Sequence, residues 1–219
     1  MKTPTGNNRL PLIIVAILVI LLGAGWAIWR ATRSGGTGGN QHPYRILGAG
    51  VGEEAGKLAG RNAPVVVIVA GGEGDPAAEK NAKIFNETLA GQGLKILATE
   101  TIPLPELAML GGPGKKIPGG HYVRILEKHP GATAIISLAG YPAFTDSVPP
   151  ASAPRAAFVA VVAAALDPMT EGPELERLLQ SGVVRLAVTR RSGTVPSPGG
   201  SQSLRAQFDT HYQVHAPAK

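Results

Sequence analysis

The sequence contains no cysteine among its 219 residues. This absence excludes a disulfide framework, a zinc site with cysteine ligands, an iron–sulfur cluster, c-type haem and a thiol nucleophile. Aromatic residues make up only 5% of the chain and charged residues 16%, whereas the hydrophobic content of 44% is ordinary for a globular protein. This length and composition predict one folded domain, with or without an appendage.

The N-terminal part of the chain has no acidic residue: all 15 lie between Glu53 and Asp209. From Arg45 onward there are 17 basic residues, so this body is close to neutral. The net charge of +6 comes largely from four basic residues that flank an apolar N-terminal run, namely Lys2, Arg9, Arg30 and Arg33. Nucleic-acid binding calls for a basic stripe with interleaved aromatic residues. We therefore expect no nucleic-acid partner.

Residues 10–30 are predicted to form a single transmembrane helix. The first 20 of them carry no charge, and a helix of that length spans about 30 Å, the thickness of the hydrocarbon layer. Trp26, Trp29 and Arg30 lie together at one end, as expected at a membrane–water interface. We expect a retained signal anchor in the lipid bilayer; a cleaved signal peptide is the alternative.

Small residues recur every fourth position in this segment, at Gly23, Ala27 and Ala31. Such a stripe allows another helix to approach closely, and it is the candidate packing face for an integral-membrane partner. The alternative is a chance recurrence of residues that are common in membrane helices. The numbers of basic residues on the two sides of the predicted helix are nearly equal, so they do not determine its orientation in the membrane. The short tail, 1–9, and the large body after the helix favour a periplasmic or other extracytoplasmic body.

Residues 31–42 form a Gly-rich linker, and residues 43–219 form the body. Apolar runs in the body predict strands, and helical spacing predicts helices between them. The expected strands are 65–70, 94–101, 132–138, 156–164 and 183–189, and the expected helices are 46–59, 76–90, 121–128 and 173–180. The Pro/Gly-rich stretches 103–120 and 141–154 are expected to be loops, and the C-terminal tail is expected to be irregular.

Strands that are apolar throughout and alternate with helices are typical of a parallel sheet covered on both faces. The sequence thus predicts a three-layer α/β/α domain, Rossmann-like, with a mostly parallel sheet of about five strands. In its order of elements the body resembles one lobe of a periplasmic-binding-protein or a flavodoxin-like fold. That resemblance implies a ligand site at the carboxyl ends of the strands.

Three loops follow predicted strands, at residues 71–75, 139–146 and 165–170. The ligand-binding candidates in them are Gly71, Gly72, Gly74, Asp146 and Asp167. Aspartates in such loops also cap the next helix, as Asp75-Pro76 suggests. His121 and His129 are expected at the surface, and Lys115 and Lys116 are expected at a solvated loop tip. No pattern indicates a catalytic residue, a metal site or a cofactor.

The sequence leads to one main hypothesis of function and two alternatives. The first is a non-enzymatic accessory subunit of a bacterial envelope membrane complex, with its helix docked to partner helices and its body contacting proteins outside the bilayer. The second is a tethered small-ligand-binding domain that resembles a periplasmic-binding-protein lobe. The third is an enzyme that depends on a metal or a phosphate group.

Overall fold

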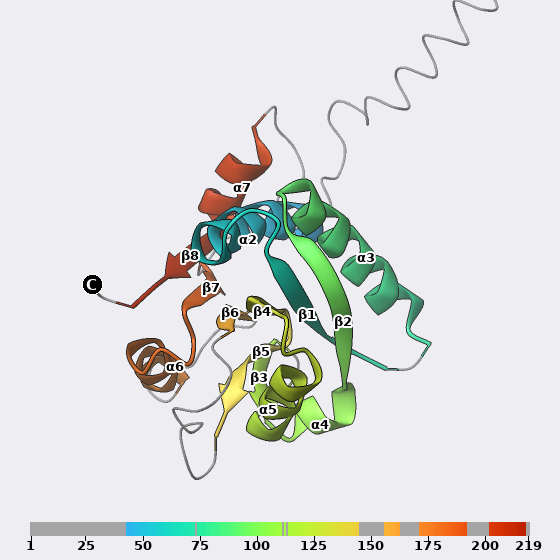
Figure 1. Ribbon diagram of the computed structural model, residues 1–219, viewed down its shortest axis with the longest axis vertical. Helices are drawn as coiled ribbons and strands as arrows, with labels where there is room; N and C mark the ends of the chain where they lie inside the picture. The colour runs from blue at the N-terminus through green and yellow to red at the C-terminus, as the bar shows by residue number, and fades with distance from the viewer. Residues whose placement is uncertain are drawn as a thin grey trace, which may run out of the picture. The chain divides into compact units, whose positions relative to one another are not determined.

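The computed structural model describes residues 43–72, 74–110, 112, 114–144, 156–162, 171–191 and 202–217 (Figure 1). Among these residues, no helix combines the length and apolar character needed to cross a membrane. The predicted anchor, 10–30, the tail and the linker all lie outside the described residues, as do Gly23, Trp26, Ala27, Trp29, Arg30 and Ala31. The anchor and its packing face therefore stay predictions.

The main described sheet is mostly parallel, as the sequence predicts. Its strand order is β2 (Lys95–Pro103), β1 (Pro64–Gly71), β4 (Ala134–Ser137), β6 (Ala157–Val162), β7 (Leu186–Arg190) and β8 (Tyr212–His215). All neighbouring strands are parallel except β7 and β8. A second, two-stranded parallel sheet consists of β3 (Lys115–Pro118) and β5 (Gly140–Ala143). We call this pair the β3–β5 ribbon.

Helices cover both faces of the main sheet. Val65, Val67 and Val69 of β1 pack with residues of α2 (Pro43–Ala59), α3 (Pro76–Gly91) and α7 (Leu204–His211). The alternate residues Val66 and Ile68 pack with α4 (Leu104–Ala108), α5 (Gly119–Lys128) and α6 (Glu171–Gln180). Figure 1 shows the two groups of helices on opposite sides of the sheet. Full burial of β1 explains why its sequence is a continuous β-branched run.

The C-terminal part of the chain is more regular than the sequence predicts. In place of an irregular tail, α7 and β8 form an ordered arm that packs against α2 and β7. The Ser203 hydroxyl caps α7 by accepting a hydrogen bond from the Ala206 N–H. This helix has only eight residues, too few for a clear helical periodicity in the sequence. The stretch 103–120 was likewise expected as a loop, but it contains α4 and β3.

Glycines in α2 allow two other helices to come close. A Cβ at Gly50 would lie 2.2 Å from the ring of Phe208 in α7, and a Cβ at Gly48 would lie 2.9 Å from Thr88 in α3. A Cβ at Gly52 would lie 2.9 Å from Gln92, which caps α3, and 3.2 Å from Leu89 within it. These glycines weaken the intrinsic helix propensity of the segment. The close packing that they permit explains why α2 nevertheless forms a buried helix.

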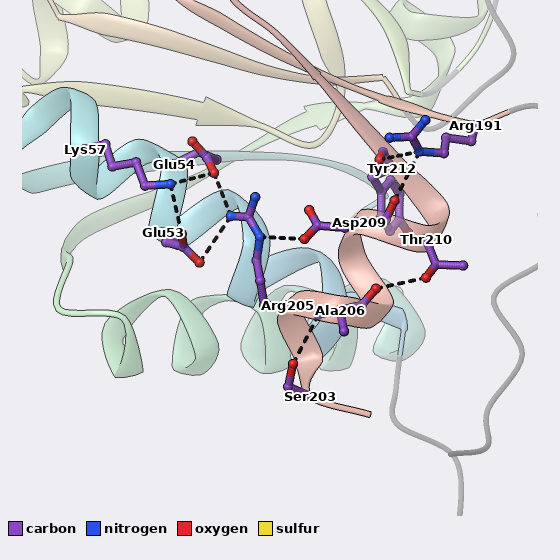
Figure 2. Close-up of polar contacts among 10 residues, drawn as sticks. All are labelled: Glu53, Glu54, Lys57, Arg191, Ser203, Arg205, Ala206, Asp209, Thr210 and Tyr212. Atoms are coloured by element: carbon purple, nitrogen blue, oxygen red, sulfur yellow. Dashed lines mark hydrogen bonds and ion pairs between the residues drawn. The ribbon is translucent and has the colours of Figure 1, made fainter. Parts of the chain in front are cut away.

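The arm is fastened to α2 by an ionic network around Arg205 (Figure 2). The Arg205 guanidinium lies 2.6 Å from a Glu54 carboxylate oxygen and 3.1 Å from one of Glu53. It also contacts Asp209, one turn further along α7, at 3.1 Å. Lys57 contacts both Glu53 and Glu54 at 2.9 Å. The network therefore joins α2 and α7 through three carboxylates and two cations.

These contacts shift the pKa values of the groups involved. Hydrogen bonding to Lys57 lowers the pKa of Glu53 below 4.5. Burial raises the pKa of Glu54, but the hydrogen bonds from Lys57 and Arg205 outweigh burial and lower it overall. The pKa of Arg205 is raised, mainly by its hydrogen bond to Asp209. The network thus favours charged carboxylates in the folded protein.

We predict that Gly50→Ala lowers the free energy of unfolding by about 1–3 kcal/mol, because the added methyl group forces Phe208 to move. Gly56→Ala in the same helix is the control, since nothing lies within 4 Å of a Cβ there. It is expected to raise stability by up to about 1 kcal/mol through helix propensity. Urea unfolding measures the free energy of unfolding of both variants. Equal changes in the two variants would contradict close packing of Phe208 against Gly50.

A second prediction concerns acid stability. Carboxylates whose folded-state pKa is lowered contribute stability above their unfolded pKa, and this contribution is lost as the pH falls through the folded pKa. Arg205→Met, which keeps an apolar stem, is expected to cost about 1 kcal/mol at pH 7, a modest figure because the side chain is partly exposed and screened. Below pH 4 the difference from the parent protein should shrink. An unchanged difference in unfolding free energy at pH 3.5 would show that Arg205 acts only by packing.

Candidate functional site

The order of the parallel strands reverses between β1 and β4. From β1 the chain proceeds to β2 on one side and then returns to β4 on the other side. In open α/β sheets of this kind, ligands bind outside the carboxyl ends of the strands, at the point of reversal. Here that point lies beyond Gly71 of β1 and Ser137 of β4. We call this region the carboxyl edge.

Among the described residues, the loop after β1 is sparsely packed at this edge. Gly71 is buried, and a Cβ there would make only ordinary contacts of 3.4–3.5 Å. Gly72 is exposed, and no described atom lies within 4 Å of a Cβ built there, whereas Gly74 has a φ of +76°. Only Gly74 is therefore required by its backbone conformation. The role of the three glycines in ligand binding stays a prediction.

Asp75 caps α3, as the sequence suggests. One oxygen of its carboxylate accepts hydrogen bonds from the Ala77 and Ala78 N–H groups, at 2.9 and 3.2 Å. The amides that would otherwise bind an anion at this helix terminus are thus already paired with a negative charge. This arrangement disfavours phosphate binding at the start of α3.

The β3–β5 ribbon begins immediately beyond the end of β4. Gly140 starts β5 with a φ of +114°, and a Cβ there would lie 2.1 Å from the Lys115 carbonyl oxygen. A residue other than glycine would therefore separate the two strands. The register of the ribbon places Lys116 beside Tyr141. Neither side chain was identified as a site residue from the sequence.

Lys116, Tyr141 and Glu174 form a polar cluster on three different elements. The Lys116 Nζ lies 2.7 Å from Glu174 Oε2, and the Tyr141 hydroxyl donates to the same oxygen at 3.4 Å. The Lys116 ammonium also lies 5.7 Å from the centre of the Tyr141 ring. Tyr141 is fully buried, and the charged side chains are 22% and 23% exposed. The expectation of a solvated loop tip is therefore wrong for Lys116.

Two histidines are also less exposed than the sequence suggests. The His121 side chain is 18% exposed and contacts Glu106, and the His129 side chain is 16% exposed and lies 2.7 Å from Glu100. His121 of α5 contacts Glu106 of α4, and His129, the residue that caps the end of α5, contacts Glu100 of β2. Both histidines thus tie elements together instead of lying freely at the surface.

Ser137 is a further polar group at the carboxyl edge. It ends β4, is completely buried, and its hydroxyl has no hydrogen-bond partner among the described residues. The register places it between Ile68 of β1 and Ala160 of β6. Burial of a hydroxyl without a partner costs free energy, so Ser137 is an unfavourable residue in an otherwise apolar strand.

The predicted aspartates are not described. Asp146 and Asp167 lie outside the described residues, so their part in a site stays a prediction. Within the described ranges, no group of three histidine, aspartate or glutamate side chains is placed to hold a metal ion.

No protein-family model matches the chain, and no curated protein matches it. Among solved structures, the chain is similar to an arabinose-binding protein from Geobacillus stearothermophilus, with 14% identity and a TM-score of 0.42 over 69% of this chain and 46% of that one. An ABC-transporter solute-binding protein from Burkholderia graminis C4D1M, in complex with D-arabinose, matches with 17% identity and a TM-score of 0.45 over 82% and 56%.

A periplasmic solute-binding protein from Actinobacillus succinogenes 130z, with bound D-allose, matches with 13% identity and a TM-score of 0.45 over 67% of this chain and 47% of that one. The present chain thus spans about half the length of these proteins.

Proposed function

We propose that the protein is a membrane-tethered domain that binds a small polar molecule at the carboxyl edge of its sheet. The observation that carries this proposal is the reversal of strand order between β1 and β4, beside the open loop at Gly72. The helix predicted at 10–30 and the Gly-rich linker would hold this domain near the bilayer, outside the cytoplasm.

The polar groups at the carboxyl edge support a binding role. Lys116, Tyr141 and Glu174 come from β3, β5 and α6, three segments that the fold brings together. Ligand sites in proteins combine a mostly apolar lining with a few convergent polar groups of this kind. The capping of α3 by Asp75 disfavours a phosphate-dependent site at the same edge.

The proposal is tested by filling the space beside the loop. Gly72→Tyr is expected to weaken binding at least tenfold, because its side chain enters the open region at the carboxyl edge. Gly91→Tyr is the matched control: Gly91 is also exposed with nothing within 4 Å of a Cβ, but it ends α3 at the other edge of the sheet. Calorimetric titration of the full chain in detergent micelles, with D-arabinose and D-allose as first probes, measures both variants.

Binding that is equal in the two tyrosine variants would contradict a site at the carboxyl edge. If neither sugar binds to the parent protein, the titration is extended to small uncharged amides and amino acids. Failure of all these probes would remove the ligand-binding proposal.

A second candidate function is that of an accessory subunit in a bacterial envelope membrane complex. It is favoured by the stripe of Gly23, Ala27 and Ala31, which would form a face for close helix packing. This function and ligand binding use different parts of the chain, the predicted helix and the body.

Gly23→Leu is expected to reduce the recovery of a partner membrane protein, because the added side chain fills the packing face. Gly25→Leu makes the same chemical change about 200° around the helix, so it should leave recovery unchanged. Purification of tagged full-length variants in mild detergent, followed by quantitative mass spectrometry, measures the difference. Equal recovery from the two variants would show that this face does not dock a partner.

A further inference from the structure

The Lys116–Glu174 pair has unused hydrogen-bonding capacity. The Lys116 Nζ donates to Glu174 Oε2 at 2.7 Å, and the same oxygen accepts from the Tyr141 hydroxyl. An ammonium group has three donors, and each carboxylate oxygen accepts more than one hydrogen bond. Within the described part of the chain, Glu174 Oε1 accepts no hydrogen bond. A donor and an acceptor thus lie side by side, and both side chains retain some exposure, 22% and 23%.

The cluster also fixes the position of this pair. The Tyr141 hydroxyl donates to Glu174 Oε2, and its buried ring lies beneath the Lys116 ammonium. Gly140 holds the two ribbon strands close enough for this arrangement. The pair is therefore built on a rigid base and not on two freely moving surface side chains, so its geometry is set before any ligand arrives.

The balance of charge determines which ligands the pair accepts. An anion that approaches Lys116 meets the Glu174 carboxylate at the same place, and a cation that approaches Glu174 meets the Lys116 ammonium. Juxtaposed like charges disfavour both. An uncharged ligand avoids this repulsion. If it carries a donor and an acceptor on neighbouring atoms, it pairs with Glu174 and Lys116 together.

We infer that the Lys116–Glu174 pair is the specificity element of the proposed site, and that it selects an uncharged ligand with a hydrogen-bond donor and acceptor on neighbouring atoms. Adjacent hydroxyl groups are the simplest chemistry of this kind. This inference rests on the proposed function, since it assigns the ligand chemistry of the same carboxyl edge.

The test separates charge selection from a purely structural role. Full-length protein in detergent micelles is titrated with the uncharged sugars D-arabinose and D-allose, the anionic D-glucuronate and the cationic D-glucosamine. The parent protein is expected to bind an uncharged sugar at least tenfold more tightly than either charged one. Glu174→Gln removes the negative charge that neutralises Lys116 and should shift the binding preference toward the anionic D-glucuronate. Lys116→Met removes the positive charge that neutralises Glu174 and should shift the binding preference toward the cationic D-glucosamine.

Glu176→Gln is the matched control, because Glu176 lies on the same helix but its carboxylate contacts Gln180. It should leave the preference unchanged. If the ion pair were only structural, its loss would weaken the binding of all four sugars alike. Opposite shifts of the charge preference in Glu174→Gln and Lys116→Met support the inference, and an equal loss of affinity for all four sugars in both variants overturns it. If Glu174→Gln and Lys116→Met both keep the parent protein's preference among the four sugars, the inference is overturned. If Gly72→Tyr still blocks sugar binding in that case, the proposed function stands. Absence of binding of any sugar to the parent protein overturns the inference.

Discussion

Close contact between α2 and its two neighbouring helices determines how one whole face of the sheet is covered. A buried helix normally keeps others at 8–10 Å through its side chains. Here Gly48 and Gly52 allow α3 to approach, and Gly50 accepts the ring of Phe208. Because Phe208 is completely buried and stacks on Tyr212 at 5.2 Å, the position of the arm, and with it β8, depends on this contact. The Arg205 network adds a modest electrostatic contribution at the rim of the same interface.

The two faces of the sheet are covered in different ways. The face of α2, α3 and α7 is held by close apolar packing, and the Arg205 network adds ion pairs between α2 and α7. On the other face, the chain departs from simple alternation of strand and helix by inserting the β3–β5 ribbon. That insertion carries Lys116 and Tyr141 to the carboxyl edge and places them against Glu174. The polar cluster thus depends on an added element, supported by a sheet whose position the opposite face secures.

Patterns that act over short distances made much of this fold predictable. The apolar run at Val67 and the run at Ile136 predicted buried parallel strands, and both residues are fully buried. Asp75-Pro76 predicted the start of α3, because a cap and a proline act within one helical turn. The arm was not predicted, since α7 is short and its burial depends on Gly50, a residue far away in the sequence. The glycines of α2 weakened the helix prediction for the same reason: their benefit exists only after α3 and α7 have packed.

The polar cluster was beyond prediction because Lys116 and Glu174 are 58 residues apart, and nothing in either local sequence marks the pairing. Its energetics nevertheless bear on its role. Partly buried charges lose hydration, and replacement of such a pair by apolar residues of similar size is often neutral or stabilising. Stability alone therefore gives little reason to place this pair over a fully buried tyrosine. Recognition gives a stronger reason, since a donor and an acceptor held at 2.7 Å present a fixed and neutral pattern that an apolar replacement would lack.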